Sequence, residues 1–212
     1  DSLSKTKKDV EIEVNAVADN PIVDWENKKF FHGGNFHGDY IASSVDQLKI
    51  GLVKLSILSE RRVNFFLDHR INKVFPPFMN LEKPGLTLGL QGLQFVATST
   101  VAQNQTYAFP HSLHSISTNG GNQDVVSMGT DAALLTAKVI ENAFIILAIE
   151  LITLAQGIDF LKADKKLSDS SRFLWGELRK IIEPIRDNQD IAPSLTKVVD
   201  MVKNNSGFLI KW

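Results

Sequence analysis

A long apolar run decides how this chain folds. Residues 122–160 read NQDVVSMGTDAALLTAKVIENAFIILAIELITLAQGIDF. Apolar residues recur there every three or four positions, which predicts one helix of roughly 55 Å at about 1.5 Å per residue. Its second half is apolar almost all round, a pattern typical of helices that are buried on every side. A chain of 212 residues offers few places to bury such a helix, so we expect it to pack against helices of other subunits.

The remaining elements follow from the same spacing and from proline and glycine breaks. They are a helical tail over residues 1–16, a hairpin over 22–31, helices over 39–68 and 89–108, and two amphipathic helices over 169–183 and 194–203. The sequence therefore predicts an all-α fold, a bundle of long helices with one short β-hairpin near residues 22–31. We expect residues 1–162 to belong to the bundle and residues 163–212 to form C-terminal helices.

Charge and composition exclude several classes of function. The formal net charge is −1, so no basic excess favours nucleic-acid binding. Cysteine is absent, which excludes disulfides, thiolate zinc sites and a cysteine nucleophile and is typical of the cytoplasm. The most apolar stretch, residues 144–155, is interrupted by Glu150 and is shorter than the roughly 20 residues of a membrane span. We expect a cytoplasmic protein with neither a membrane nor a nucleic-acid partner.

A glycine-rich turn precedes the helix expected from residue 39. It reads GGNFHGD over residues 33–39 and presents Asn35, Phe36 and His37 in consecutive positions. The run suits an ordinary strand-to-helix turn, in which glycines adopt positive φ and Asp39 caps the helix. It also suits a ligand site, in which glycines let the backbone approach a ligand and Phe36 forms a pocket wall. Spacing alone favours the ordinary turn.

A second polar run lies at the expected start of the long helix. It contains Asn119, Asn122, Gln123 and Asp124 around a Gly-Gly pair at 120–121. A flexible loop followed by a helix N-terminus explains it, with Asp124 complementing the helix dipole. In the alternative interpretation, the same positive helix end and its amides stabilise negative charge on a reacting group.

Four histidines raise the question of a metal site. His32 and His37 form one pair, and His111 and His114 form the other. Neither pair has a third ligand at a suitable spacing or the i, i+4 spacing of helical metal ligands. Hydrogen-bonded loop histidines are the better interpretation, and we expect no metal site.

Two charged groups fall on the expected helices. Residues 59–62, Ser-Glu-Arg-Arg, are typical of a solvated helix face or, alternatively, of an ion-pair cluster between subunits. Glu150 lies in a run of Ile and Leu, where an unpaired carboxylate would be costly. We expect Glu150 to be a structural, hydrogen-bonded carboxylate rather than a catalytic one.

Six motifs occur in an order that resembles one enzyme family. They are NAVADNP at 15–21, GGNFHGD at 33–39, SERR at 59–62, LGLQG at 88–92, NQDVVSMG at 122–129 and the apolar stretch 141–160. Together they resemble the C-terminal half of the aromatic amino-acid ammonia-lyases. That family includes histidine, phenylalanine and tyrosine ammonia-lyases and the related 2,3-aminomutases. The resemblance covers residues 9–162 and is strongest to bacterial tyrosine ammonia-lyases.

The resemblance implies a fold and a chemistry. Members of the family are all-helical homotetramers whose active sites are built from several subunits. Their electrophile, 4-methylidene-imidazol-5-one, forms from an Ala-Ser-Gly run, which does not occur in this chain. The amino group of the substrate adds to it, a tyrosine base removes the β-proton, and ammonia leaves to give an α,β-unsaturated acid.

The resemblance also assigns roles to individual residues. Phe36 matches a phenylalanine near the electrophile. Gln123 matches a pocket position that is Glu in histidine-specific members and Gln in members specific for phenylalanine or tyrosine. We expect Phe36 and Gln123 to act in catalysis. The expected substrate-binding residues are Gln91, Asn119, Asn122, Asn35 and His37.

We expect a C-terminal fragment of a longer lyase. The chain starts at Asp1, and the segments that carry the family's catalytic tyrosine and carboxylate-binding residues lie upstream. Alone it should be inactive, because it needs the missing N-terminal part and the homotetramer. The intact enzyme would eliminate ammonia from tyrosine or phenylalanine. The alternatives are a tyrosine or phenylalanine 2,3-aminomutase, a histidine ammonia-lyase, and a degenerate helical oligomerisation module without activity.

Overall fold

The structure is a computed structural model that describes residues 1–83 and 85–204. These residues form seven α-helices and two short strands, which confirms the all-α class with one hairpin. The chain divides into two compact units. Unit 1 comprises residues 1–53 and 105–140, and unit 2 comprises residues 54–104 and 141–212. Three helices begin in one unit and end in the other, namely α2 (Asp39–Leu67), α4 (Gln91–Tyr107) and α5 (Gly129–Leu161).

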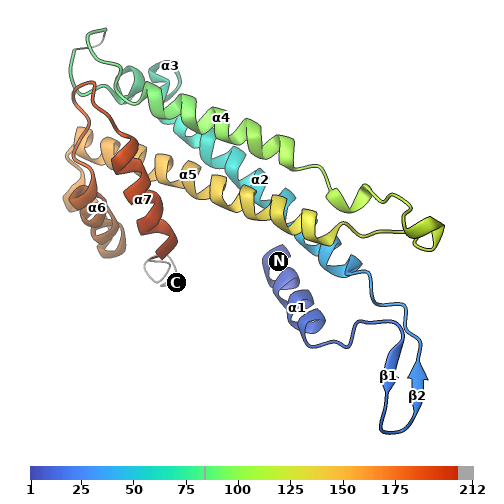
Figure 1. Cartoon of the computed structure of the whole chain (residues 1–212). Helices are drawn as coiled ribbons and strands as arrows, with labels where there is room; N and C mark the ends of the chain where they lie inside the picture. Colours follow the sequence, from blue (N-terminus) through green and yellow to red (C-terminus); the bar gives the residue numbers. More distant parts are fainter. Residues whose placement is uncertain (84, 205–212) are drawn as a thin grey trace. The chain divides into compact units, whose positions relative to one another are not determined.

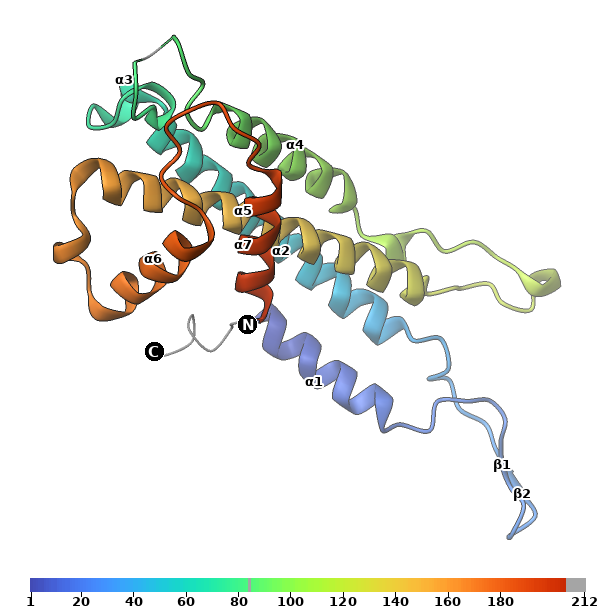
Figure 2. The same ribbon diagram turned by 60° about the vertical axis from the view of Figure 1, so that its left-hand side comes forward.

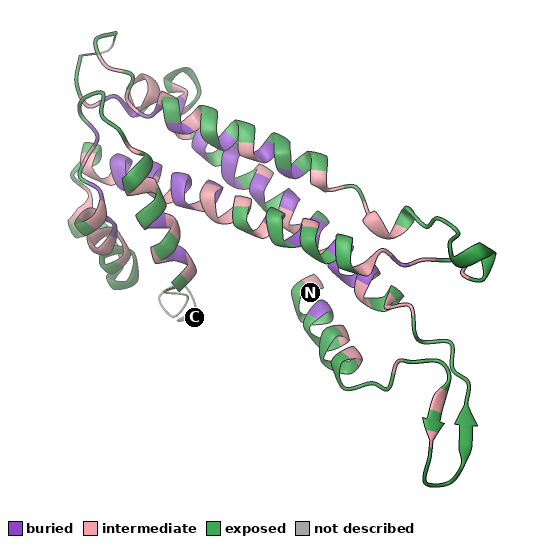
Figure 3. Cartoon of the chain, in the orientation of Figure 1, coloured by how far each residue is buried: buried purple, intermediate pink, exposed green. Residues whose placement is uncertain are grey.

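Unit 1 carries the hairpin and a small core. Its elements are α1 (Ser2–Val14), β1 (Ile22–Asp24), β2 (Lys29–Phe31), the first part of α2 (Asp39–Leu67), the end of α4 (Gln91–Tyr107) and the first part of α5 (Gly129–Leu161). The two strands pair antiparallel, as the arrows in Figure 1 show. Ile22 lies opposite Phe31. Ala42 and Val45 of α2 pack with Ala132 of α5. The hairpin lies largely in solvent (Figure 3).

Unit 2 holds the larger core. It contains the rest of α2, α4 and α5 together with α3 (His69–Asn72), α6 (Asp169–Ile181) and α7 (Ala192–Asn204). Buried residues from α2, α4, α5, α6 and α7 form one cluster in this unit. Figure 2 draws the ribbons of these helices. Gln156 of α5 is fully buried there, and its Nε2 donates to the Ile185 carbonyl at 2.8 Å. Because its Oε1 also accepts the Ile185 N–H at 3.0 Å, Gln156 fixes the segment between α6 and α7 to α5.

The structure confirms the helical tail and the helices expected over residues 39–68, 89–108, 169–183 and 194–203. The long helix, however, starts later than the sequence predicts. Helix α5 spans Gly129–Leu161, and the prediction of a start at Asn122 is wrong. Met128 has φ of +53°, which is outside the helical region. The Ser127 hydroxyl accepts the Gly129 N–H at 3.3 Å and caps the true start.

The apolar length of α5 also corrects an expectation. By length and composition alone, Gly129–Leu161 is long enough to cross a membrane, whereas residues 144–155 are not. The core helix of a globular protein passes the same test, and 56% of the apolar window is buried within the chain. Glu150, Thr153 and Gln156 are buried polar residues on this helix. Its apolar character therefore supports a core role.

Candidate functional site

All of the expected site residues except Gln91 lie on two loops of unit 1. The connection from β2 to α2 holds Asn35, Phe36 and His37, and the connection from α4 to α5 holds Asn119, Asn122 and Gln123. The exception, Gln91, is the first residue of α4 and belongs to unit 2. We call residues 32–38 the first loop and residues 108–128 the second loop.

The first loop presents an aromatic ring at the surface. Phe36 is 38% exposed, and its ring centroid lies 4.4 Å from that of His37 with the planes tilted by 40°. Asn35 Nδ2 lies 3.5 Å from Glu13 Oε2, at the limit of a hydrogen bond. Gly38 has φ of +69°, a conformation that favours glycine. The loop therefore combines an ordinary glycine turn with an available ring face.

The second loop closes on itself in a tight turn. The Thr118 N–H donates to the Gln123 carbonyl at 2.9 Å, and the Gln123 N–H donates to the Thr118 carbonyl at 3.3 Å. Gly120, with φ of +64°, forms the tip. The turn leaves Asn119 and Asn122 exposed and Gln123 half-buried. Three amide side chains are thus displayed on one short turn.

These amides do not lie at a helix N-terminus, which corrects the interpretation of the second polar run. Helix α5 begins at Gly129, beyond the turn, and its first-turn acidic residue is Asp131. The predicted dipole role of Asp124 is therefore wrong. The physical reason is that the left-handed Met128 separates the polar run from the helix.

The two loops meet where α2 and α5 begin. The Ser127 hydroxyl, at the end of the second loop, donates to the His37 carbonyl of the first loop. A Cβ atom built on Gly129 would lie 3.4 Å from the Gly38 carbonyl oxygen, so these backbones are close. Among the described residues, no hydrogen bond or ring contact joins Phe36 to Gln123. The structure thus joins the loops by their ends and not by these side chains.

The histidines of the second loop pack as rings. His114 lies 4.8 Å from His111 and 5.2 Å from Phe109 between ring centroids. Over residues 1–83 and 85–204, no group of three or more His, Cys, Asp or Glu side chains is arranged to hold a metal ion. The ring contacts give these imidazoles a structural explanation.

Two buried charged residues of α2 that the sequence analysis did not select lie against the second loop. The Lys49 side chain is fully buried, and its Nζ lies 2.7 Å from Asp46 Oδ1. The same Nζ donates to the Phe109 carbonyl at 3.0 Å, and Asp46 Oδ2 accepts the Ser112 N–H at 2.9 Å. In a sequence, an i, i+3 charge pair on a helix normally indicates a solvated face. The special position of Asp46 and Lys49 is therefore evident only from their burial in the structure.

The solvated-face interpretation of residues 59–62 holds for Arg61 and Arg62, which are exposed, and is wrong for the other two residues. Ser59 and Glu60 are buried in unit 2. Arg62 Nη2 donates to Glu150 at 3.0 Å, and the Ser59 hydroxyl donates to the same carboxylate. Hydrogen bonding to Glu150 raises the pKa of Arg62. Glu150 is therefore the structural, hydrogen-bonded carboxylate that the sequence predicts, and its partners lie in its own chain.

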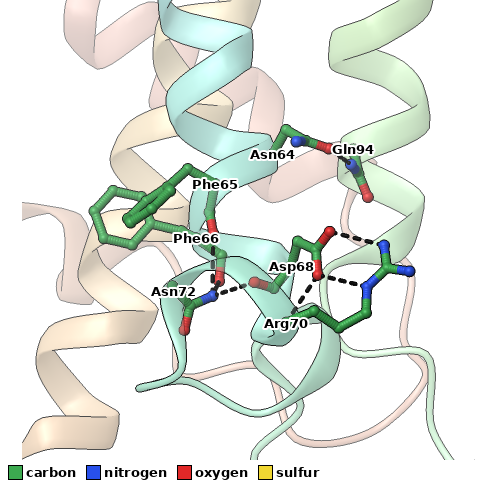
Figure 4. Close-up of polar contacts among 7 residues, drawn as sticks. All are labelled: Asn64, Phe65, Phe66, Asp68, Arg70, Asn72 and Gln94. Atoms are coloured by element: carbon green, nitrogen blue, oxygen red, sulfur yellow. Dashed lines mark hydrogen bonds and ion pairs between the residues drawn. The ribbon is translucent and has the colours of Figure 1, made fainter.

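A pocket of about 380 Å³ opens in unit 2 where α2 ends. Residues of α2, α3, α4 and the Pro77–Met79 turn line it. Asn64 and Gln94 join across it through an amide hydrogen bond of 2.9 Å (Figure 4). None of the expected site residues lines this pocket. Sequence reasoning missed it because Asn64 and Gln94 are far apart in the chain.

Asp68 forms the polar edge of this pocket. It accepts the Arg70 N–H at 3.0 Å as the cap of α3, and Arg70 Nη2 donates to it at 2.8 Å (Figure 4). Hydrogen bonding to the Arg70 side chain lowers the pKa of Asp68 to about 2. The signal that sequence reasoning could have used is the helix cap at Asp68 with an arginine in the first turn.

Comparisons with known proteins identify relatives of this chain. It matches the family described as Aromatic amino acid lyase over residues 1–180. Histidine ammonia-lyase 1 of Fusobacterium nucleatum is 37% identical over 205 residues, which are 97% of this chain and 40% of that protein. Tyrosine ammonia-lyase of Cupriavidus metallidurans is 38% identical over 180 residues, which are 85% of this chain and 34% of that protein.

A solved structure agrees with these relatives. The crystal structure of tyrosine aminomutase from Streptomyces globisporus has a TM-score of 0.91 and 35% identity, over 98% of this chain and 39% of that chain. This chain spans about 40% of the length of the histidine lyase and the aminomutase. The predicted family and its helical fold are confirmed, and the chain belongs to the aromatic amino acid lyase family.

Proposed function

We propose that this chain is the C-terminal portion of an ammonia-lyase that converts tyrosine or phenylalanine to an α,β-unsaturated acid. One observation carries the choice of substrate, namely the neutral amide of Gln123 on the turn of the second loop. The resemblance matches this position to Glu in histidine-specific members. A neutral amide suits an aryl ring, whereas a carboxylate suits a basic imidazole.

The two loops of unit 1 are proposed to form part of the wall of the substrate pocket. Phe36 contributes an exposed ring, and Asn119, Asn122 and Gln123 contribute amide donors and acceptors. The remaining proposed substrate-binding residues are Asn35, His37 and Gln91. This combination of an apolar surface with a few directed polar groups is typical of small-molecule sites.

The proposed enzyme uses 4-methylidene-imidazol-5-one as the electrophile for the amino group of the substrate. No Ala-Ser-Gly run occurs in residues 1–212, so another part of the protein would supply this group. Phe36 fits a place beside it, because its exposed ring offers a flat apolar surface to a planar group. The residues of this chain would bind and orient the substrate and exclude water. We expect the chain alone to be inactive.

Exposed apolar side chains support a larger assembly. Leu55, Leu58, Phe65 and Phe95 are 62%, 49%, 46% and 64% exposed on α2 and α4. Large exposed apolar residues of this kind indicate surfaces that are covered by partners. We propose the remainder of the same protein and further copies in a homotetramer as those partners, with a cytoplasmic location supported by the absence of cysteine.

The assignment of two parts of the chain to two parts of the enzyme is also a proposal. Residues 1–162 would belong to the central helical bundle of the enzyme, and residues 163–212 would form its C-terminal helices. The family match over residues 1–180 is consistent with both parts belonging to one enzyme.

Product analysis tests the proposed function. The complete protein that contains this chain would be incubated separately with tyrosine, phenylalanine and histidine, and the products identified by mass spectrometry. We expect coumarate or cinnamate. A β-amino acid product would instead establish a 2,3-aminomutase, the alternative favoured by the structural similarity to tyrosine aminomutase. An imidazole acrylate would establish a histidine lyase. No turnover of any of the three would support the degenerate module.

A further inference from the structure

We propose that the buried pair Asp46 and Lys49 positions the second loop, and thereby the amides of Asn119, Asn122 and Gln123, for the substrate. The activity part of this inference rests on the proposed function, whereas the structural part does not. Neither residue belongs to the proposed pocket wall. Both lie on the first part of α2 within unit 1, which also contains both loops.

The first observation is that the pair binds the backbone of the second loop directly. Lys49 Nζ donates to the Phe109 carbonyl at 3.0 Å, immediately after α4 ends. Asp46 Oδ2 accepts the Ser112 N–H at 2.9 Å. Two charged side chains on neighbouring turns of α2 therefore hold two backbone groups at the beginning of the second loop.

The second observation is that the same loop is tied to the region of α2 at its other end. The Ser127 hydroxyl donates to the His37 carbonyl, just before α2 begins. Thr136 of α5 donates to the Val45 carbonyl of α2 at 3.1 Å. The first turns of α2 are therefore the common base of both loops, because the first loop leads directly into them.

The third observation is the depth at which the pair is buried. Lys49 is 0% exposed and Asp46 is 3% exposed, and both residue types are rarely buried to this extent. Burial by itself would raise the pKa of Asp46, but hydrogen bonding to Lys49 and to the Ser112 and His111 N–H groups lowers it below its usual value. The carboxylate therefore stays charged, and its oxygens interact with the Lys49 ammonium and with the Ser112 N–H of the second loop.

A buried ion pair is weak evidence for stability, because the desolvation of both charges offsets their attraction. Its geometric effect is stronger, since a buried charge must keep its partners in place. Here the partners are backbone groups of the second loop, at Phe109 and Ser112. Between Ser112 and Ser127 the loop is largely exposed, so its position depends on the anchors at its two ends.

The test compares three variants of the complete protein. Lys49→Met keeps the aliphatic volume, removes the bond to Phe109 and leaves the Asp46 carboxylate without its cation. The double variant Asp46→Asn/Lys49→Met leaves no buried charge and keeps an acceptor for the Ser112 N–H. Glu150→Gln is the control, because Glu150 is a buried carboxylate whose partners, Ser59 and Arg62, both lie in unit 2.

Two measurements separate positioning from general destabilisation. The first is hydrogen exchange of the backbone amides of residues 109–123. The second is the ratio of kcat/KM for tyrosine to kcat/KM for phenylalanine. That ratio does not depend on the amount of folded enzyme, so a merely structural role would not change it.

We expect Lys49→Met to speed exchange of residues 109–123 at least tenfold and to change the substrate ratio at least threefold. The double variant should recover part of both effects, and Glu150→Gln should change neither. Unchanged exchange in Lys49→Met and in the double variant would overturn the inference, as would an unchanged substrate ratio. If Lys49→Met does not fold, the double variant is compared with Glu150→Gln. Faster exchange of residues 109–123 in the double variant would support the inference, and equal exchange would overturn it. A wild-type enzyme that does not act on tyrosine or phenylalanine would refute the proposed function, and exchange would still decide the anchoring role.

Discussion

Units 1 and 2 stabilise their polar groups in different ways. In unit 2, Glu150 and Gln156 are satisfied within a large apolar cluster that draws on five helices. In unit 1 the apolar cluster is small, and the polar side chains proposed for the substrate lie on exposed loops. Long-range polar anchors, such as the pair Asp46 and Lys49, replace apolar packing there. Unit 2 therefore depends on its core, and unit 1 depends on directed hydrogen bonds.

The largest expected effect is on the core of unit 2. Ile149 is fully buried in its cluster, so Ile149→Ala should lower the free energy of unfolding by about 2–5 kcal/mol through lost burial and a residual cavity. Chemical denaturation of the complete protein measures this, with Lys197→Ala, at an exposed polar position of α7, as the control. If Ile149→Ala also lowered turnover per folded enzyme by an equivalent free energy, the proposal that unit 2 supplies stability and unit 1 carries the substrate residues would be wrong.

The next effect concerns the proposed pocket wall of unit 1. Phe36→Ala and Gln123→Ala in the complete protein should each lower turnover at least tenfold, equivalent to about 1.4 kcal/mol of transition-state stabilisation. Phe30→Ala is the matched control, since Phe30 is an exposed phenylalanine of strand β2. Full activity of the Phe36 and Gln123 variants would show that these two side chains do not take part in the substrate site.

Much of the fold was readable from periodicity. Apolar residues at helical spacing placed α2, α4, α6 and α7 within a few residues of their observed ends. The start of α5 was not readable in this way, because apolar side chains at Val125 and Met128 continue the pattern beyond the helix. The true start depends on the backbone at Met128 and on the Ser127 hydroxyl, which are local features that periodicity does not report.

The candidate site was readable only in part. Glycine-rich runs signalled both loops, and the structure joins those loops at Ser127 and His37. The pair Asp46 and Lys49 could not be recognised, because its spacing is also that of an ordinary surface ion pair. The pair differs from a surface ion pair because it is buried under the second loop. The loop residues that it contacts, Phe109 and Ser112, lie some 60 positions further along the chain, so local sequence does not reveal the contact.

A smaller effect is expected on substrate choice within unit 1. Gln123→Glu places a carboxylate where we propose that an aryl ring binds, so kcat/KM for tyrosine should fall relative to that for histidine. Gln105→Glu, at an exposed position near the end of α4, adds the same charge outside the proposed pocket wall and serves as the control. Steady-state kinetics with both substrates measure the ratio. An unchanged ratio in the Gln123 variant would remove the basis for choosing tyrosine or phenylalanine.

The smallest expected effect is electrostatic and lies in unit 2. Hydrogen bonding to Arg70 lowers the pKa of Asp68 to about 2 from an ordinary value of 3.8. A carboxylate whose pKa is lower in the folded than in the unfolded state stabilises the fold above pH 4, and this contribution is lost as the pH falls from about 4 to about 2. The thermal midpoint of wild-type protein should therefore exceed that of Asp68→Asn by more at pH 5 than at pH 3.

The exposed control for this comparison is Asp200→Asn on α7, in the same unit. Because Arg70 is largely solvent-exposed, added salt should shrink the Asp68 difference at pH 5. The buried pair of unit 1 should respond less to salt, since Asp46 and Lys49 are shielded from counterions. Equal salt sensitivity of the two pairs would show that burial does not separate the electrostatics of the two units.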